Sequence, residues 1–305
     1  MYIVDFFKRM GRKANVPVII YLIINIFVIG FAVALMFGLK YWVALLIGVG
    51  LYAISMVIAL SPAGEWILRQ QTGCKEMEDP EQIAYLEPLF QEVYAKAKEA
   101  DPSISNEVKM FISDDEDPNA FATGRKTVCI TAGMMQMPAD QIKATLGHEF
   151  GHLAHKDTDL ILVVSVGNMI VNACITIFRV IIEIAHFILN LAGNIWGGDG
   201  GWLMSAASSL YRVCMTAIIG GLTWLWTKLG VLLVMKSSRD NEFEADAFSS
   251  DLGYGNELCA MLDTIVPASG KKGLFACLAS SHPGKEDRIA KLQAKGATYM
   301  TPYQE

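Results

Sequence analysis

Long apolar stretches alternate with polar stretches along this chain of 305 residues. Val16 to Phe37 and Tyr41 to Leu60 are almost unbroken apolar runs, separated by the short turn Gly38-Leu39-Lys40. Each run has about the 20 apolar residues that a helix needs to cross a bilayer. The first run is too long for the apolar part of a cleaved signal peptide, so we expect it to be retained. The pattern predicts a transmembrane hairpin over residues 1–61, with spans at about 16–37 and 41–60.

The apolar pattern returns at about residues 160–178 and 213–235, which predicts a second transmembrane hairpin over residues 160–235. The connection between these spans, at residues 193–201, is rich in Gly and Trp and carries little charge. The chain is therefore expected to contain four transmembrane helices.

Two polar stretches remain, at residues 62–159 and 236–305. In the first, Pro80 to Ala100 places apolar residues at helical spacing with charges opposite, which indicates an amphipathic helix. Short strands are expected at Glu107–Ser113 and Thr127–Thr131, followed by a helix that begins near Ala139. We expect the two stretches to form one α+β domain, mostly helical with a small sheet, which the second hairpin interrupts.

Positive charges indicate which side of the membrane each stretch faces. The N-terminal tail carries Lys8, Arg9, Arg12 and Lys13, whereas the connection between the third and fourth spans is nearly bare until Arg212. Cytoplasmic loops carry an excess of Lys and Arg. We therefore expect both termini and both polar stretches to be cytoplasmic.

Composition agrees with a membrane protein and argues against one class of partner. Hydrophobic residues make up 53% of the chain and the mean hydropathy is +0.36, both high for a soluble enzyme. The formal net charge of −6 argues against nucleic-acid binding, which normally requires a basic face. The six cysteines form no C-x-x-C pair, so we interpret them as buried small hydrophobes in a reducing compartment.

One short motif in the helix expected from Ala139 carries the candidate chemistry, Gly147-His148-Glu149-Phe150-Gly151-His152. On a helix, His148 and His152 lie one turn apart on one face, where they can hold two positions of a tetrahedral zinc. Glu149 between them can act as general base on a metal-bound water. A catalytic zinc needs a third protein ligand, which must come from elsewhere in the chain.

Few residues can supply that third ligand. His155 lies one further turn along the motif helix, and a rigid helix cannot easily bring three successive imidazoles onto one ion. His186 falls on the far side of the expected membrane. The carboxylates between Arg239 and Asp246 are a better source, although residue chemistry alone does not rank Glu242 over Glu244.

These motifs resemble those of the HtpX family of membrane zinc metalloproteases, which is related to the CaaX prenyl proteases. The resemblance covers almost the whole chain, including the four apolar spans in the expected order. Its matching segments are His148-Glu149-Phe150-Gly151-His152, Ser238-Arg239-x-x-Glu242-Phe243-x-Ala245-Asp246, Pro118 to Gly124, Asp157, and Ser281-His282-Pro283 with Arg288. One departure is His155-Lys156, where the family commonly has Asn-Gly.

The resemblance implies a zincin-like metalloprotease fold and a role for each matched residue. It implies that Glu242 is the third ligand of one zinc ion per chain, and that Asp246 supports a ligating histidine. It also implies that His282 stabilises the oxyanion, with Arg239 and Arg288 close by.

A short segment before the motif is a candidate for substrate binding. Asn119, Ala120, Phe121 and Ala122 are expected to form a strand edge to which an extended substrate adds through backbone hydrogen bonds. A simple hairpin end is the alternative interpretation, because such pairing is not written in the side chains.

We therefore expect a membrane-bound zinc endopeptidase in which Glu149 directs a zinc-activated water at a peptide carbonyl. The site is expected at the cytoplasmic face of an inner (plasma) membrane, so the substrates should be polypeptides near the bilayer, mainly membrane proteins. The resemblance implies membrane-protein quality control under stress. The sequence does not predict an oligomeric state.

Other functions fit some of these features. A protease that trims prenylated C-terminal peptides would use the same residues, but that relative usually encloses its site with more transmembrane helices. A zinc-dependent membrane scaffold that cleaves nothing would not need Glu149, because a structural site closes with four ligands. A transporter would need paired charges near the bilayer midplane, and the sequence offers no convincing pair.

Overall fold

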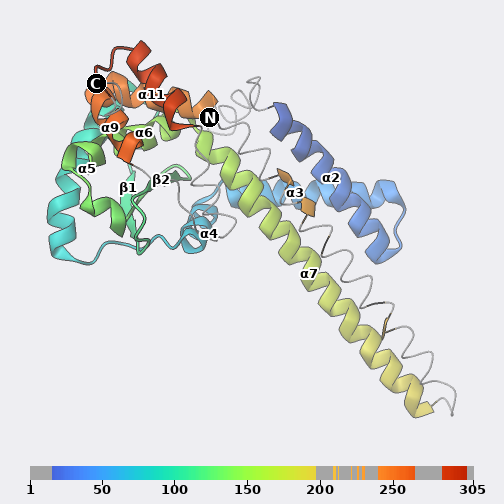
Figure 1. Cartoon of the computed structure of the whole chain (residues 1–305). Coiled ribbons are helices and arrows are strands. Elements are labelled where there is room, and N and C mark those ends of the chain that lie inside the picture. The colour runs from blue at the N-terminus through green and yellow to red at the C-terminus, as the bar shows by residue number, and fades with distance from the viewer. Residues whose placement is uncertain are drawn as a thin grey trace.

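The chain forms an α+β domain at one end of a bundle of long helices (Figure 1). The computed structural model describes residues 16–196, 209–210, 212, 221, 225–226, 229–230, 240–264 and 284–300. Within these residues the α+β domain is mostly helical with one small sheet, as the sequence predicts.

The expected first hairpin is formed by α2 (Val16–Phe37) and α3 (Tyr41–Ala59). The turn between them includes Gly38 at a φ of +61°, a conformation that glycine adopts without a steric penalty. Among the described residues, α3 is the one helix that is long and apolar enough to cross a membrane, judged by length and composition. Within α2, the apolar part is shorter and extends from Ile19 to Phe31.

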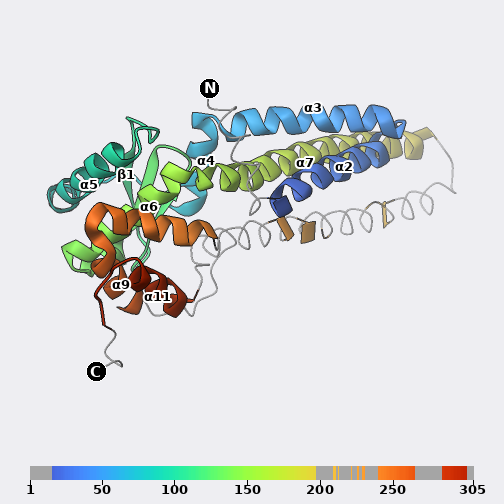
Figure 2. The ribbon, with the colours of Figure 1, turned by 90° about the horizontal axis from the view of Figure 1, so that it is seen from above.

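The third apolar stretch lies within α7 (Asp157–Trp196), a single helix of 40 residues. The apolar pattern predicted the end of this span near residue 178 and a connection at 193–201, but the helix continues through residue 196. The ion pair of Arg179 Nε with Glu183 Oε1 at 3.4 Å, one turn apart, supports this continuation. The first part of α7 packs along α2 and α3 (Figure 2), and its second part projects beyond them (Figure 1). Residues 197–208 and most of the expected fourth span lie outside the described residues.

A short helix that the sequence analysis did not anticipate, α4 (Pro62–Thr72), follows α3 directly. Ser61 caps its first turn by accepting a hydrogen bond from the Ala63 N–H at 3.2 Å, and Gly73 ends it in the left-handed conformation. Trp66 on this helix is 57% exposed, whereas its neighbour Glu65 is buried against the domain.

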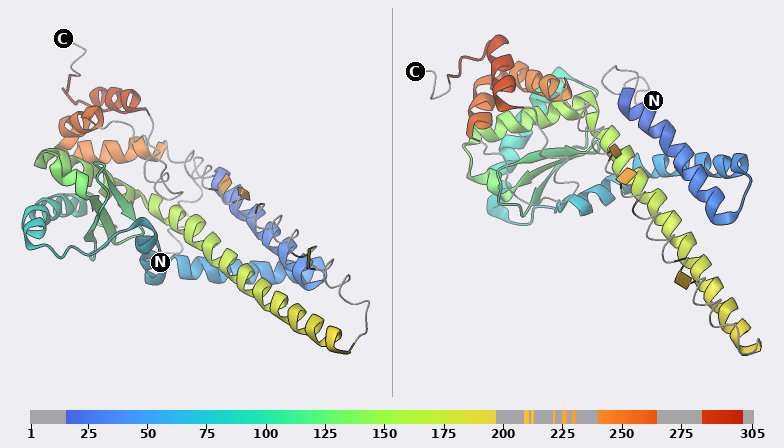
Figure 3. Two further views of the ribbon diagram at one scale, coloured as in Figure 1. Left: turned by 60° about the horizontal axis from the view of Figure 1, so that its bottom comes forward. Right: turned by 45° about the vertical axis from the view of Figure 1, so that its right-hand side comes forward.

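The sheet contains β1 (Lys109–Ser113), β2 (Ala120–Thr123) and β3 (Thr127–Thr131) in the order β1-β3-β2 (Figure 3). β1 runs parallel to β3, and β2 pairs antiparallel with β3 from Ala120 opposite Ile130 to Thr123 opposite Thr127. β2 is therefore an edge strand.

Helices from both polar stretches contribute buried residues to one hydrophobic core. From the first stretch come α5 (Pro80–Ala100), η2 (Ala132–Gln136) and α6 (Ala139–His155). The second stretch supplies the helical residues 240–249, the π-helical turn η3 (Ser250–Tyr254), α9 (Gly255–Thr264) and α11 (Lys285–Ala294). Phe150 of α6 packs in this core with Met261 of α9 and Leu292 of α11.

Candidate metal centre

The expected metal motif lies on α6, as predicted, and its two histidines face the same side of the helix. The imidazole Nε2 atoms of His148 and His152 are 3.2 Å apart, with the two rings nearly perpendicular. His148 is 3% exposed and the side chain of His152 is 12% exposed. Two histidines one turn apart thus present their nitrogens to one point in a buried site.

A second helix, formed by residues 240–249 and here called the Glu242 helix, crosses α6 at very short distance. A Cβ atom on Gly151 would lie 2.8 Å from the Cα of Ala245, closer than real Cβ contacts. One turn after Ala245, Ser249 Oγ donates a hydrogen bond to the Ala144 carbonyl at 2.8 Å. The glycine of the motif therefore allows the Glu242 helix to approach the two histidines.

This crossing brings the Glu242 carboxylate to the histidine pair. Its Oε2 is 3.4 Å from His148 Nε2, and its Oε1 is 3.3 Å from His152 Nε2. In a tetrahedral site with ligand atoms about 2.0 Å from the zinc, neighbouring ligand atoms are about 3.3 Å apart. The separations between neighbouring donor atoms are close to this edge length, although the two histidines face different oxygens of Glu242. One donor atom from each of His148, His152 and Glu242 lies within 4.8 Å of the other two, so the three residues can hold a single metal ion. Glu244 lies outside this group.

Both histidines are held from behind by carboxylates. His148 Nδ1 lies 2.8 Å from Asp246 Oδ1, and His152 Nδ1 lies 3.2 Å from Asp157 Oδ2. A hydrogen bond at Nδ1 fixes the tautomer that leaves Nε2 for a metal. Asp157 was recognised in the sequence only as part of the family pattern, and the structure places it against His152.

Arg288 of α11 connects two of the carboxylates. Its Nε and Nη2 donate to the two oxygens of Asp246 at 2.7 and 2.5 Å, and its Nη1 lies 3.4 Å from Glu242 Oε2. Arg288 is 3% exposed, so this bidentate pair is shielded from water. The guanidinium thus holds Asp246 against His148 and balances part of the buried negative charge.

The side chains of the site favour one another's charged forms. Burial tends to lower the pKa of His148, but hydrogen bonds to Asp246 and Glu242 outweigh it and raise this pKa. The pKa of His152 is raised well above the usual range, because Asp157 and Glu242 likewise outweigh burial. Burial acts to raise the pKa of Asp246, but Arg288 and His148 hold it at about 2. The site therefore attracts a positive charge, which can be a proton or a metal ion.

Glu149 occupies a different position from the ligand group. Its side chain is buried, and its Oε2 accepts a hydrogen bond from the backbone N–H of Ala122 at 2.6 Å. In the antiparallel pairing of β2 with β3, Ala120 and Ala122 direct their backbone groups to the open edge of the sheet. The expected substrate edge and the expected general base are therefore in direct contact.

Several sequence-predicted residues are placed elsewhere or lie beyond the described ranges. His155 packs against Phe248 with ring centroids 6.1 Å apart, and His186 is exposed on α7. His282 and Arg239 lie outside the described residues.

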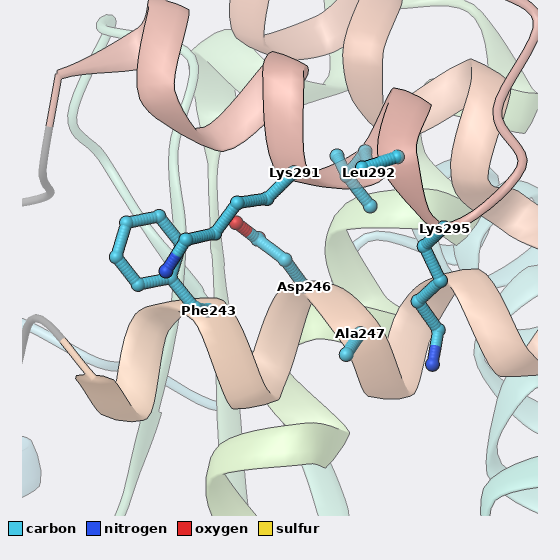
Figure 4. A pocket seen from close by; sticks show the side chains of 7 residues that line it. Phe243, Asp246, Ala247, Lys291, Leu292 and Lys295 are labelled. Atoms are coloured by element: carbon cyan, nitrogen blue, oxygen red, sulfur yellow. The ribbon is translucent and has the colours of Figure 1, made fainter.

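Behind the metal site, a cavity of about 320 Å³ separates the Glu242 helix from α11. Figure 4 shows Asp246 between the two helices, with Lys291 extending from α11 over the ring of Phe243. The Lys291 Nζ lies 3.1 Å from the centre of that ring, a cation–π contact. This contact helps to hold α11, and with it Arg288, against the Glu242 helix.

The chain matches a known peptidase family and several named proteases. The profile of peptidase family M48 matches residues 80–295. Protease HtpX of Idiomarina loihiensis is 28% identical over 249 residues, which span 75% of this chain and 79% of that protein. Protease HtpX of Shewanella piezotolerans is 29% identical over 301 residues, which span 92% of this chain and 96% of that protein. The Protease HtpX homolog of Nitrosomonas eutropha is 30% identical over 251 residues, which span 75% of this chain and 78% of that protein.

Solved structures with a similar course of the chain include the crystal structure of Ste24p from S. mikatae. It has a TM-score of 0.40 and 19% sequence identity, and the match covers 95% of this chain and 65% of that one.

Proposed function

The chain belongs to peptidase family M48 and is a metalloprotease, and from this premise we propose a more specific function. We propose that it is a membrane-bound zinc endopeptidase with one zinc ion per chain. The observation that carries the proposal is the cluster of donor atoms from His148, His152 and Glu242, in which each imidazole Nε2 lies 3.3 to 3.4 Å from one oxygen of the carboxylate and 3.2 Å from the other Nε2. Two imidazoles and one carboxylate are a donor set of catalytic zinc sites, which keep one position for water or substrate.

Zinc bound to these residues would supply Lewis acidity, which polarises a peptide carbonyl and lowers the pKa of water. The Glu149 carboxylate would take the proton of the attacking water and return it to the leaving amine. Its Oε2 is oriented by the Ala122 N–H, so this edge of β2 positions the base.

The substrate is proposed to bind as an extended strand along β2. The outward backbone groups of Ala120 and the carbonyl of Ala122 would pair with it, since the Ala122 N–H already binds Glu149, and Asn119 and Phe121 complete the segment. His282 is proposed to meet the oxyanion, with Arg239 nearby. The described contacts of Arg288, to Asp246 and Glu242, favour holding the ligands over contacting substrate.

We further propose that four transmembrane helices place the site at the cytoplasmic face of an inner membrane, where it cleaves membrane proteins as part of quality control. Support comes from the apolar helices α2, α3 and α7, which meet the domain at one end. Relatives with the name Protease HtpX that match over most of the chain add to this support.

The central experiment compares zinc content and cleavage of an unfolded, membrane-tethered polypeptide by the purified wild-type protein and three variants. Glu149→Gln is expected to keep zinc and lose cleavage by at least about a hundredfold, as expected for loss of the general base. Glu242→Gln should lose zinc as well. Glu244→Gln, two residues from the proposed ligand, should retain both and serves as the matched control.

Equal cleavage by wild-type protein and Glu149→Gln would overturn the mechanism and indicate a contaminant. Zinc binding without cleavage by the wild-type protein would favour the scaffold function. The orientation can be tested separately by fusing a fluorescent protein to the C-terminus and a periplasmic phosphatase into residues 193–201. Both reporters should be active, because the fluorescent protein folds on the cytoplasmic side, where we place the C-terminus, and the phosphatase is active on the opposite side, where we place residues 193–201.

A further inference from the structure

The turn between β2 and β3 lies against two helices that continue from the apolar bundle. The turn consists of residues 124–126, and Gly124 has a φ of +63°, a conformation that glycine adopts without a steric penalty. On one side is α4, which follows α3 directly and contacts both β2 and α7 (Figure 1). On the other side is the first turn of α7. The mechanism proposed above assigns no role to these contacts.

From α4, the buried Glu65 contacts the backbone of the turn. Its Oε1 accepts a hydrogen bond from the Arg125 N–H at 3.0 Å. A Cβ atom on Gly124 would lie 2.5 Å from Glu65 Cγ, so only glycine lets the two segments approach this closely. One helical turn further along α4, Arg69 Nη1 donates to the Thr127 hydroxyl at 3.0 Å, at the start of β3. α4 therefore contacts the turn and the strand that follows it.

A buried carboxylate at this position is costly to the fold. Glu65 is 7% exposed, and burial raises its pKa, an effect that the Arg125 N–H and the charge of Arg69 offset only in part. A polar group that is buried at such a cost is retained where its hydrogen bond is needed. The hydrogen bond of Glu65 is the one to the backbone of the turn.

From α7, two successive residues contact the same turn. The Thr158 hydroxyl donates to the Gly124 carbonyl, and Asp159 Oδ1 lies 3.5 Å from Arg125 Nε. The residue before them is Asp157, which lies against the proposed zinc ligand His152. The start of α7 thus joins the turn to the metal site.

The helices that hold the turn are packed into one unit. Ala59 at the end of α3, Leu68 of α4 and Leu162 of α7 lie in one buried cluster. A Cβ atom on Gly64 would overlap the Ala59 carbonyl, which shows how tightly α4 folds against the end of α3. The position of the turn is therefore set by the ends of the long helices as well as by the sheet.

The turn in its place determines where β2 lies. Ala122 is two residues before Gly124, and its N–H donates to Glu149 Oε2 at 2.6 Å. β2 pairs with β3 alone, so the turn and this one ladder fix the distance from Ala122 to Glu149. We propose that Glu65 is a positioning residue for Glu149, which acts by holding the turn so that β2 keeps the Ala122 N–H on the carboxylate. The inference rests on the proposed function of Glu149 as general base.

The test compares the purified full-length wild-type protein with Glu65→Ala, Glu65→Gln and Glu76→Ala. Alanine removes the acceptor of the Arg125 N–H, whereas glutamine keeps an acceptor oxygen at the same distance along the side chain. Glu76 is an exposed glutamate in the loop after α4 and provides the matched control. The measurements are kcat and KM per zinc-bound molecule, below the unfolding temperature of every variant, and the hydrogen exchange of the backbone amides of residues 120–124.

Glu65→Ala should lower kcat by at least about tenfold, because displacing a catalytic group by about 1 Å can cost a hundredfold. Its KM and zinc content should change by less than about threefold, since the base acts in the transition state. Amides at 120–124 should exchange faster, while those of β3 and α6 stay protected. Glu65→Gln and Glu76→Ala should resemble the wild type. A merely structural role of Glu65 would lower the folded fraction and leave kcat per zinc-bound molecule unchanged.

Unchanged kcat and unchanged exchange at 120–124 in Glu65→Ala overturn the proposal. Equal losses in Glu65→Gln and Glu65→Ala also overturn it, because they assign the effect to charge and not to the hydrogen bond with the turn. Faster exchange throughout the domain assigns Glu65 to overall stability, with the same consequence. If wild-type protein and Glu149→Gln cleave equally, the proposed function fails, and the exchange at 120–124 alone then decides whether Glu65 holds β2. The two failures are therefore distinguishable.

Discussion

At the scale of single residues, protons and metal compete for the same two nitrogen atoms. In the metal-free site the pKa of His148 is raised above its ordinary 6.5, and that of His152 is raised further. Protonated imidazole does not bind metal, so we expect zinc affinity to fall with decreasing pH from above the ordinary histidine range. The measurement is a zinc titration against a competing chelator between about pH 5 and 9. Affinity that does not change with pH would contradict the role of these residues.

The same pKa shifts predict opposite pH dependences for the two forms of the protein. Raised folded-state pKa values stabilise the metal-free fold fully below the unfolded value near 6.5, and this contribution is lost as pH rises through the folded values. The zinc-bound form should instead gain stability as pH rises, because its imidazoles must be neutral. Thermal unfolding with zinc and with a chelator across this pH range should show the two trends cross. Parallel curves would contradict the prediction.

Asp246 provides a second prediction at this scale. With a pKa of about 2, it stays ionised and joins His148 to Arg288. Asp246→Asn should weaken zinc binding by about 10- to 100-fold, the usual effect of removing such a partner. It should also destabilise the protein by about 3 kcal/mol, because Arg288 would remain buried without its carboxylate. Asp140→Asn, an exposed position on the same helix as the histidines, is the control in both assays.

The site residues that lie close together in the sequence could be predicted from their spacing. Those that meet only through contacts between distant segments could not. His148, Glu149 and His152 share one helical turn, so their spacing alone indicated the motif. Whether Glu242 or Glu244 is the ligand depends on how a distant helix crosses α6. Residue chemistry left this choice open, and only the family resemblance favoured Glu242. The Ala122 hydrogen bond to Glu149 could not be foreseen, because it depends on the backbone of a neighbouring strand.

At the scale of elements, the crossing of α6 with the Glu242 helix is fixed by Gly151. Gly151→Ala would place a methyl group 2.8 Å from the Ala245 Cα and separate the helices. We expect lower zinc affinity and a stability loss of about 1–3 kcal/mol, typical of overpacking. Zinc titration and thermal unfolding measure the two effects. Gly50→Ala, where a Cβ meets nothing within 4 Å, is the control and should leave both unchanged or raise stability.

Elements with strong local signals were predicted well, and those set by distant contacts were not. The helix Pro80–Ala100 was predicted with its observed bounds, because its apolar residues recur regularly at helical spacing. The strand at Thr127–Thr131 was also predicted correctly, but its parallel pairing with β1 is a non-local choice. The length of α7 was underestimated, since charged residues at 179 and 183 were interpreted as the end of a span.

At the scale of the whole molecule, polar side chains within the bundle join stretches that lie far apart in the sequence. Asn25 Nδ2 on α2 donates to Asn168 Oδ1 on α7 at 2.8 Å, and Asn168 Nδ2 donates to the Tyr21 hydroxyl at 2.6 Å. Trp226 Nε1 donates to Asn25 Oδ1 at 2.7 Å and stacks on Tyr21. Apolar burial does not drive association between helices in lipid, so such hydrogen bonds can specify which helices pair. The apolar pattern predicted long helices but gave no information on these partners.

This network predicts a measurable coupling between α2 and α7. Asn25→Leu and Asn168→Leu should each destabilise the bundle, because each leaves the other amide buried without its partner. The double variant should be less destabilised than the sum of the two, by about 0.6 kcal/mol as found for hydrogen bonds between membrane helices. Unfolding in detergent of the wild type, both single variants and the double variant provides the cycle, with Asn172→Leu on α7 as a control for added apolar surface. Strictly additive effects would show that the two asparagines contribute separately and that packing alone holds α7 against α2.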